Sequence, residues 1–260
     1  MIRPRISIIT VVYNAKDELR ATLENLKNIR YPDKEIVVID GNSTDGTKDV
    51  IAEYALDITC FVSEPDKGIY DAMNKGLALA TGDYVWFINA GDFVYSPDFL
   101  INTFQGQELD ADIYYGETLV ISEDGEPLGL RKKRLPKKLR WQSFRKGMVV
   151  CHQSILVKKS IAPKYDLSYR YAADVLWVLE SLKRAKNIYN TRQIISKFRE
   201  GGVSTINRKV SLKERFKIMT QHFGLFQTII SHIVFMFDYF KPKYRKNNLI
   251  YRRHVKPNLS

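Results

Sequence analysis

The clearest structural pattern in the sequence is an apolar run that ends in small and acidic residues, Thr81-Gly82-Asp83-Tyr84-Val85-Trp86-Phe87-Ile88-Asn89-Ala90-Gly91-Asp92. A continuous apolar run between two glycines is typical of a central parallel strand that is covered on both faces. Asp92 then follows the carboxyl end of that strand, which is where open α/β sheets bind their ligands. Ala90 and Gly91 leave room for a large ligand beside the carboxylate. Taken alone, these residues also suit a simple strand-ending turn.

The residues before this strand alternate between strand and helix patterns. Apolar β-rich runs at residues 6–12, 35–40 and 58–62 predict three strands, and apolar residues at helical spacing follow each of them. Asn14, with Asp17 three residues later, predicts the start of the first helix. Strand and helix patterns alternate four times, which predicts a parallel sheet with right-handed crossovers.

The alternation stops after Asp92. Residues 113–122 predict a strand that enters a hairpin turn at 123–126, residues 155–157 predict another strand, and residues 175–185 predict a helix. The enzyme-like part is expected to end near Gly201 and Gly202. Residues 131–140 carry seven Lys and Arg side chains, which suit either a solvated loop or a contact for phosphate or membrane.

The tail combines an apolar segment with a basic one. Residues 223–240 are densely apolar but include Gln227, His232 and Asp238, so they are too interrupted for a spanning helix, which needs about 20 apolar residues. One helical stripe contains Phe226, Ile229, Ile230, Ile233, Phe237 and Phe240, and Lys and Arg residues follow it. This pattern favours a helix in the interface of an anionic membrane. The alternative is a helix that packs on the domain or on a second copy of the chain, as a homodimer.

Composition sets the class of partner but does not choose one. The 260 residues are 45% hydrophobic and 27% charged, which indicates a globular protein with a sizeable core. The net charge of +12 predicts anionic partners such as nucleotide phosphates, lipid headgroups or nucleic acid. Cys60 and Cys151 lie far apart, without metal-ligand spacing, and suit a reducing cytoplasm. The first residues contain no apolar secretion signal, so the protein is expected to stay inside the cell.

Four motifs together resemble family 2 glycosyltransferases with the GT-A fold. They are Ser7-Ile8-Ile9-Thr10-Val11-Val12-Tyr13-Asn14, Val38-Ile39-Asp40-Gly41-Asn42-Ser43-Thr44-Asp45-Gly46-Thr47, Asp71-Ala72-Met73-Asn74-Lys75-Gly76 and Asn89-Ala90-Gly91-Asp92. The resemblance implies an α/β, Rossmann-like and mostly parallel central sheet with helices on both faces. It implies a nucleotide-sugar-binding half at 1–105, an acceptor-binding half at 106–206 and an amphipathic helical tail at 207–260.

The resemblance also places a nucleotide-sugar, taken as a UDP-sugar, at the ends of the first strands. Asp40 would accept hydrogen bonds from the base or ribose. The residues that this placement assigns to nucleotide binding are Thr10, Tyr13, Asp40, Asp66, Lys67 and Asn74.

A leaving diphosphate needs its developing charge neutralised, and a hard divalent cation, Mn²⁺ or Mg²⁺, does this through oxygen ligands. The family usually supplies two acidic residues for the metal. Here only Asp92 carries a carboxylate, and Asn89 can add an amide oxygen. Because fewer charged ligands bind a cation more weakly, we expect weak metal binding at Asp92.

The acceptor hydroxyl needs a base as it attacks the anomeric carbon. By resemblance the base is Asp174, although an Asp at a helix start is also a common cap. His152 is the rival base, and Gln153 beside it would face the acceptor. Arg199 and the loop at 201–204 would close over the diphosphate or the acceptor.

The implied activity is inverting transfer of a sugar to a hydroxyl of a lipid-linked glycan, in polysaccharide or lipopolysaccharide assembly. The enzyme would be cytoplasmic and peripheral on the inner face of the cell membrane, without a nucleic-acid partner. A nucleotidyltransferase is the first alternative, but residues 12–16 lack its Gly-rich phosphate loop. A non-catalytic basic module that binds membrane or nucleic acid is the second alternative, and it leaves the acidic residues at the strand ends unexplained.

Overall fold

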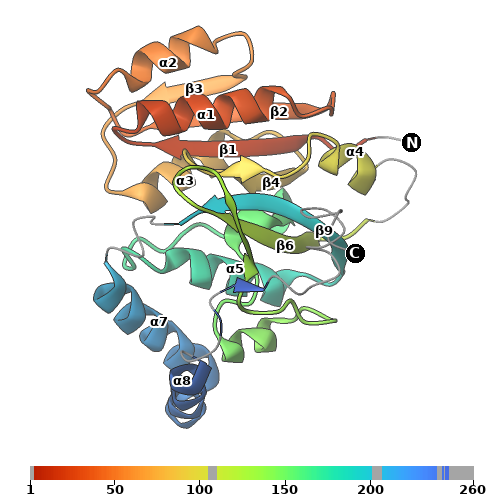
Figure 1. Cartoon of the computed structure of the whole chain (residues 1–260), viewed down its shortest axis with the longest axis vertical. Coiled ribbons are helices and arrows are strands. Elements are labelled where there is room, and N and C mark those ends of the chain that lie inside the picture. Colours follow the sequence, from red (N-terminus) through yellow and green to blue (C-terminus); the bar gives the residue numbers. More distant parts are fainter. Residues whose placement is uncertain (1–2, 105–109, 201–206, 239–241, 243, 246–260) are drawn as a thin grey trace.

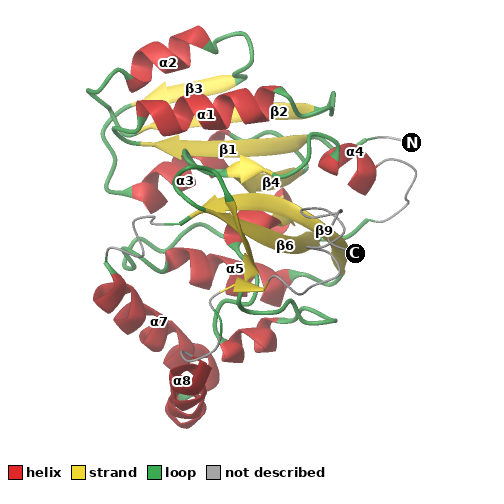
Figure 2. Cartoon of the chain, in the orientation of Figure 1, coloured by secondary structure: helices red, strands yellow, loops and turns green. Residues whose placement is uncertain are grey.

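The computed structural model describes residues 3–104, 110–200, 207–238, 242 and 244–245, and it is built around one mixed sheet (Figures 1 and 2). The strands pair in the order β10-β7-β6-β8-β4-β1-β2-β3, and β9 pairs with β6 and β5. Their bounds are β1 Ile6–Val12, β2 Lys34–Asp40, β3 Cys60–Ser63, β4 Tyr84–Phe87, β5 Phe93–Val94, β6 Ile113–Ile121, β7 Pro127–Arg131, β8 Ile155–Lys158, β9 Ile188–Arg199 and β10 Tyr244–Arg245.

Helices cover both faces of the sheet, as the sequence predicts (Figure 2). Residues of α1, α2 and α4 share one apolar core with the strands, and residues of α3, α5 and α7 share the other. The helix bounds are α1 Lys16–Lys27, α2 Thr47–Glu53, α3 Ile69–Leu79, α4 Phe99–Phe104, α5 Ala173–Arg184, α7 Arg208–Phe223 and α8 Leu225–Asp238, with 3₁₀ turns η1 Trp141–Lys146, η2 His152–Ser154 and η3 Lys159–Ile161.

The predicted parallel sheet is confirmed in the first half of the chain. Strands β3, β2, β1 and β4 are all parallel neighbours. Strand β4 pairs with β1 on one side and with the antiparallel β8 on the other, and every residue of it is buried because its side chains alternate between the two apolar cores. The central strand therefore lies where the parallel half meets the mixed half, and Asp92 follows its carboxyl end.

Two predicted boundaries are wrong for local reasons. The third strand begins at Cys60 rather than 58, because the amides of Asp57 and Ile58 bond to Tyr54 O and close the turn after α2. The first helix is not capped by Asn14: it begins at Lys16 without a side-chain cap.

Asn14 instead joins two loops at the carboxyl edge of the sheet. Its φ is 46°, its side-chain oxygen accepts from Thr44 N at 2.9 Å, and its own N–H donates to Ser43 Oγ at 2.8 Å. Asn tolerates this left-handed conformation better than most residues. The loops after β1 and β2 are therefore held together by Asn14.

Close packing explains the glycine in the third motif. A Cβ at Gly76 would lie 2.4 Å from Ile9 Cγ2, so only glycine lets α3 approach β1 this closely. The motif residue therefore has a structural role under the sheet.

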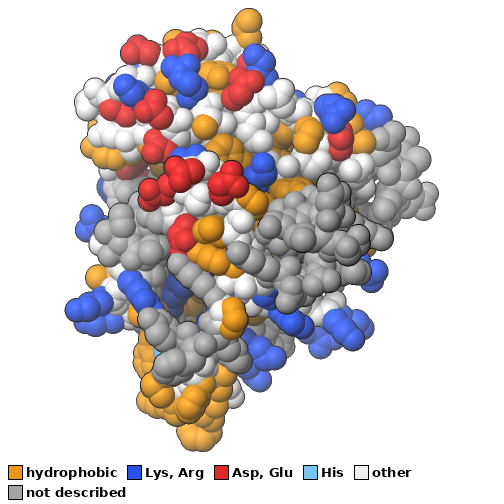
Figure 3. Space-filling model, viewed as in Figure 1, with side chains coloured by type: hydrophobic (Ala, Val, Ile, Leu, Met, Phe, Trp, Pro, Cys, Tyr) orange, Lys and Arg blue, Asp and Glu red, His pale blue; other side chains and the backbone are white. Residues whose placement is uncertain are grey.

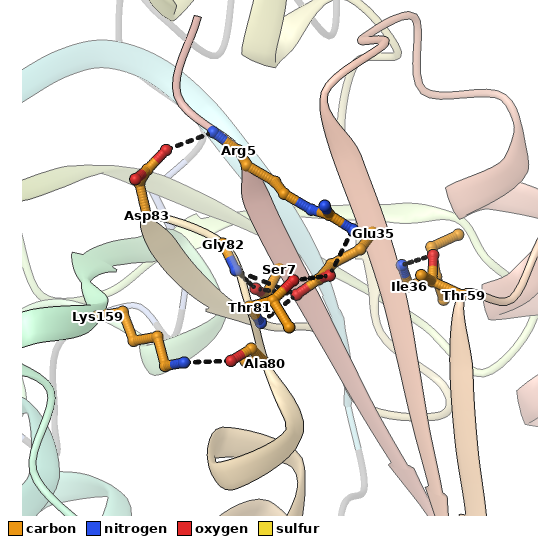
Figure 4. A network of polar contacts seen from close by, with 10 residues as sticks. All are labelled: Arg5, Ser7, Glu35, Ile36, Thr59, Ala80, Thr81, Gly82, Asp83 and Lys159. Atoms are coloured by element: carbon orange, nitrogen blue, oxygen red, sulfur yellow. Dashed lines mark hydrogen bonds and ion pairs between the residues drawn. The ribbon is translucent and has the colours of Figure 1, made fainter.

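A buried carboxylate ties the opposite, amino edge of the sheet together (Figure 4). Glu35 on β2 accepts from Ser7 Oγ at 2.5 Å and from both the amide and hydroxyl of Thr81 at 2.6 Å. Arg5 forms an ion pair with it at 2.9 Å. Burial alone would raise the pKa of Glu35, but these hydrogen bonds and the Arg5 charge hold it below its ordinary value.

The second half of the chain confirms the predicted β6–β7 hairpin, the strand β8 and the helix α5. The long strand β9 was not predicted, because polar residues interrupt its apolar pattern. Its pairing with β6 is irregular, and Arg192 there has a φ of 55°.

Helix α8 lies within the predicted segment 223–240, and α7 before it was not predicted; Gly224, with a φ of 82°, separates the two helices. The predicted residues 201–204 and Phe240 lie outside the described residues. None of the described helices is long and apolar enough to cross a membrane.

Candidate active site

The turn after β4 is shaped by glycine and held by α1. Gly91 has a φ of 90°, and Asp92 N donates to Asn89 O at 2.9 Å. The hydroxyl of Thr22 on α1 accepts from Gly91 N and donates to Asp92 O, both at 3.0 Å. Helix α1 therefore fixes the backbone on which the Asp92 side chain stands.

The Asp92 carboxylate is buried and has one neutral hydrogen-bond donor. Gln153 Nε2 donates to Asp92 Oδ2 at 2.9 Å, and the Cys151 thiol donates to Gln153 Oε1 at 2.8 Å. Burial raises the pKa of Asp92 to about 6, although the Gln153 bond and the charges of His152 and Arg199 oppose the rise. The carboxylate therefore gains or loses its charge near neutral pH.

Two consecutive residues of η2 lie between the predicted metal ligand Asp92 and the predicted base Asp174. Gln153 contacts Asp92, while His152 Nδ1 lies 3.7 Å from Asp174 Oδ2, longer than a hydrogen bond. The turn is anchored, because Trp86 Nε1 donates to Gln153 O at 2.8 Å. His152 Nε2 is buried without a hydrogen-bond partner among the described residues.

Asp174 lies in the first turn of α5 and does not cap it, since that helix has no side-chain cap. The Tyr70 hydroxyl donates to Asp174 Oδ1 at 3.3 Å. Burial alone would raise the pKa of Asp174, but the nearby His152 and Arg215 hold it below its ordinary value. Asp174 is therefore ionised at neutral pH and able to accept a proton.

Helix α7 contributes to this side of the site, which the sequence did not predict. Glu214 accepts from the amides of Arg170 and Tyr171 at 2.9 and 2.8 Å, just before α5. Arg215 acts on the charge of Asp174, and Ile218 is fully buried. The apolar residues of α7 do not fall on one face, so periodicity could not reveal this packing.

Three of the residues predicted to bind the nucleotide lie together at one edge of the sheet: Asp40, Tyr13 and Asp66. Asp40 is fully buried and accepts hydrogen bonds from the hydroxyls of Ser43 and Ser63, the latter at 2.6 Å. A Cβ at Gly41 would lie 2.5 Å from Asp66 Oδ2 and 3.2 Å from the Tyr13 ring, so both side chains lie over this glycine.

The other residues predicted to bind the nucleotide do not join the Asp40 group. Thr10 is fully buried and its hydroxyl donates to Ile88 O at 2.8 Å. Asn74 bonds through both amide atoms to the Tyr165 backbone, at 2.7 and 2.9 Å. Lys67 is exposed in the loop just before α3. Their roles toward the nucleotide stay predictions.

Arg199 ends β9 near the Asp92 turn. Its guanidinium lies over the Phe93 ring, 5.5 Å from the ring centre, and its Nε is buried without a partner among the described residues. Its charge lowers the pKa of Asp92. Arg199 is therefore placed to meet negative charge beside Asp92.

The oxygen atoms around Asp92 determine whether the predicted divalent cation fits the site. Across the described part of the chain, no three His, Cys, Asp or Glu side chains cluster to hold a metal ion. Asn89 Oδ1 is buried without a hydrogen-bond partner there, in the same turn as Asp92. The Asn89 amide oxygen and the Asp92 carboxylate fit a hard divalent cation that takes its remaining ligands from phosphate and water.

Comparison with known proteins decides the family. Residues 7–165, more than half of the chain, match glycosyl transferase family 2. The chain is a family 2 glycosyltransferase. The matched region includes the turn at Asp92 and the whole of η2, and it ends before Asp174.

Two bacterial relatives of this glycosyltransferase are named for the biosynthesis of PGL/p-HBAD and of teichuronic acid. It is 31% identical over 191 residues to a PGL/p-HBAD biosynthesis glycosyltransferase of Mycobacterium bovis, covering 67% of this chain and 68% of that protein. It is 26% identical over 203 residues to TuaG of Bacillus subtilis, which is named for teichuronic acid biosynthesis, covering 76% and 79% of the two chains.

Solved structures confirm the GT-A fold for this glycosyltransferase. S. aureus TarS in complex with UDP-GlcNAc superposes with a TM-score of 0.65 at 16% identity, covering 89% of this chain and 73% of that one. The mannosyltransferase PcManGT from Pyrobaculum calidifontis, in complex with GDP-Man and Mn²⁺, gives 0.60 at 16% identity, covering 90% and 75%. Family membership also removes the nucleotidyltransferase and the non-catalytic module as alternatives.

Proposed function

We propose that this glycosyltransferase moves a sugar from a UDP-sugar to a hydroxyl of a lipid-linked glycan, with inversion at the anomeric carbon. The observation that carries the proposal is the pair of contacts made by η2. Gln153 contacts a carboxylate that follows β4, His152 approaches a second one on α5, and the two differ in protonation behaviour. Two carboxylates with opposite pKa shifts suit two different tasks.

Asp174 takes the base role in this proposal. The acceptor oxygen forms a bond to the anomeric carbon as the bond from that carbon to the diphosphate oxygen breaks, and Asp174 receives the hydroxyl proton. UDP leaves with the electron pair of the broken bond. A single displacement of this kind inverts the anomeric configuration. Tyr70 holds Asp174 Oδ1 and leaves Oδ2 on the side of His152.

Asp92 and Asn89 are the residues that would hold a divalent cation. Bound there, Mn²⁺ or Mg²⁺ would offset negative charge on the diphosphate. PcManGT, of the same fold, binds GDP-Man with Mn²⁺. Gln153 keeps the Asp92 carboxylate oriented, and Arg199 adds a positive charge on the same side.

The donor class is supported by the nucleotide edge and by the fold. Tyr13 is 65% exposed beside the buried Asp40 loop, so its ring is available for stacking on a base. TarS, of the same fold, binds UDP-GlcNAc. A lipid-linked acceptor would bring the enzyme to the inner face of the cell membrane as a peripheral protein, and the exposed apolar α8 supports this placement.

A thermal-shift panel tests the donor and the metal together. We expect UDP-sugars to raise the melting temperature of the full chain more with Mn²⁺ than without it, since a ligand at about 100 times its Kd adds about 2.7 kcal/mol to the free energy of unfolding. A GDP-sugar should give a smaller shift. Failure of every UDP-sugar to stabilise the chain would reject the donor, and a product with retained anomeric configuration by NMR would reject inversion.

A further inference from the structure

Helix α8 packs with its polar side inward. Thr228 is fully buried and Ser231 is 6% exposed, and their hydroxyls bond to carbonyls one turn earlier. Phe226 and Phe237 are 79% and 64% exposed. The exposed apolar residues, here called the α8 apolar face, include Phe226, Ile229, Ile233, Val234, Met236 and Phe237. A contiguous exposed apolar surface of this kind marks an interaction site.

The charges around this face indicate a membrane surface as the partner. On the side shown in Figure 3, Asp and Glu side chains gather in the upper half and middle, whereas Lys and Arg side chains flank the apolar tip below. Lys133 Nζ lies 4.1 Å from the centre of the Phe235 ring on α8, and Arg145 lies 5.8 Å from that of Phe223. An apolar helix with cations beside it suits the interface of an anionic bilayer.

A cleft of about 460 Å³ is lined in part by the 3₁₀ turn η1, which also contacts α8. It is bordered by η1 and by the carboxyl end of α5. The Trp141 ring in its wall stacks on Phe223 with ring centres 5.6 Å apart, and Phe223 is the last residue of α7, just before α8. The turn η1 therefore links the cleft to the two C-terminal helices.

The cleft has a cationic rim and an apolar floor. Lys137, Lys138, Arg140 and Lys186 are exposed at the rim, and among the described residues none of their side chains forms an ion pair. Leu182 lies in the lining, and no described Asp or Glu does. By contrast, Lys183 pairs with Glu180 at 3.0 Å. Unneutralised cations above apolar side chains suit a phosphate that is carried on an amphiphile.

We propose that this cleft binds the phosphate of an anionic lipid headgroup while the α8 apolar face lies in the bilayer. The proposal rests on the peripheral membrane placement proposed above and adds a lipid site to it. The site is separate from the transfer chemistry, because Asp174 opens α5 whereas the cleft lies at the other end of that helix, roughly 16 Å along its axis. The phosphate would fix which way the enzyme faces on the membrane.

Vesicle flotation of the full chain tests the cleft. The cleft variant carries Lys137→Gln, Lys138→Gln and Arg140→Gln, and the matched control loses the same charge from the nucleotide half through Arg20→Gln, Lys27→Gln and Arg30→Gln. On vesicles of phosphatidylcholine with phosphatidylglycerol, we expect the cleft variant to bind roughly 100-fold more weakly than the wild type. The control should bind within a few-fold of the wild type. Equal weakening of both variants would overturn the site in favour of net charge alone.

A helix variant and a soluble anion complete the test. Phe226→Glu with Phe237→Glu should abolish binding to all vesicles, because it charges the α8 apolar face. Soluble glycerol phosphate should leave vesicle binding unchanged; if it or inorganic phosphate competes fully at millimolar concentration, the cleft is a site for free anions and the proposal fails. Vesicle binding by the helix variant equal to that of the wild type would also overturn it.

The outcome is independent of the transfer reaction. Each variant is first checked for its thermal shift with UDP-sugar and Mn²⁺, which reports folding and donor binding without any lipid. A variant that loses vesicle binding but keeps the thermal shift with UDP-sugar and Mn²⁺ has a defect in membrane binding alone. A missing donor shift in the wild type would reject the proposed donor and leave the flotation result interpretable.

Discussion

Gln153 donates a hydrogen bond to the buried carboxylate of Asp92 at 2.9 Å, from the turn η2 that also brings His152 to Asp174. The bond joins the carboxyl end of β4 to a segment more than sixty residues later in the chain. It also opposes the effect of burial on the pKa of Asp92, which lies at about 6. The Gln153 amide, with the charges of His152 and Arg199, therefore helps to set the charge of Asp92 near neutral pH.

Gln153→Leu should move the acid limb of the pH profile. Without the amide donor the pKa of Asp92 rises above 6, so kcat/KM for the donor at subsaturating Mn²⁺ should begin to fall at a higher pH than in the wild type. Cys151→Ala is the control, since it removes the thiol that bonds to Gln153 but leaves the amide. An unshifted limb in Gln153→Leu would assign the limb to a different group.

Asp92→Asn should abolish transfer and yet stabilise the metal-free protein. The folded pKa of about 6 lies above the unfolded value of about 3.9, so the native state binds the proton more tightly. The charged carboxylate therefore costs stability as pH rises through this window. At pH 8 the variant should gain up to about 3 kcal/mol in free energy of unfolding, and below pH 4 it should gain almost nothing. Urea titrations at both pH values measure this, and a less stable variant at pH 8 would contradict the burial argument.

The central strand and its polar end were predictable from residues 81–92, because a buried parallel strand has a continuous apolar pattern. The tie between Asp92 and Gln153 was not predictable, since no local pattern shows which amide reaches a distant carboxylate. Thr22 on α1, which holds the Asp92 backbone, looks in the sequence like any polar helix residue. Strand ends are thus visible in a sequence, while the contacts that orient them are not.

Asp174→Asn should lower kcat strongly, on the order of 100-fold or more. The rise in melting temperature that UDP-sugar and Mn²⁺ produce should stay near that of the wild type. The amide is nearly the same size and still accepts from Tyr70, but it cannot take the proton. Single-turnover transfer measures the chemical step directly.

His152→Ala separates the two candidate bases. If Asp174 is the base, removing the imidazole changes kcat less than Asp174→Asn does. A normal kcat in Asp174→Asn, together with a large loss in His152→Ala, would transfer the base role to His152.

Glu35→Gln should destabilise the fold in a pH-dependent way. The folded pKa of Glu35 is depressed, so its stabilising effect is present above the ordinary glutamate pKa of about 4.3 and is lost as pH falls through the folded value. At pH 7 we expect a loss of roughly 3 kcal/mol, because an ion pair and charge-assisted hydrogen bonds disappear. The exposed pair of Arg20 and Glu53 gives the control: Glu53→Gln should change the free energy of unfolding little, because solvent screens an exposed ion pair. Equal losses in both variants would contradict the network.

The second half of the chain was harder to predict than the first. The strand β9 runs for twelve residues beside β6, but its irregular register and polar residues hide the period of a strand. The tail was predicted as one apolar stripe, and that stripe is largely exposed on α8. The sequence could not show that α7, directly before it, packs beside Asp174 through Glu214 and Arg215.

Shortening the chain at two places should separate the roles of α7 and α8. A chain that ends at Gly224 keeps α7, with its hydrogen bonds from Glu214 to the segment before α5 and its buried Ile218. It should retain the donor shift and turn over a soluble acceptor within a few-fold of the full chain, but lose activity on an acceptor embedded in vesicles. A chain that ends at Asn207 should lose both activities, because the Glu214 contacts disappear and a fully buried side chain is removed from the core, which typically costs 2 to 5 kcal/mol, roughly as for a large-to-small core substitution. Circular dichroism and the donor shift report folding in each case. Full activity on the soluble acceptor by the Asn207 chain would refute the role of α7. If only the Gly224 chain aggregates, α8 contributes to the stability of the fold and its role in membrane binding would be contradicted.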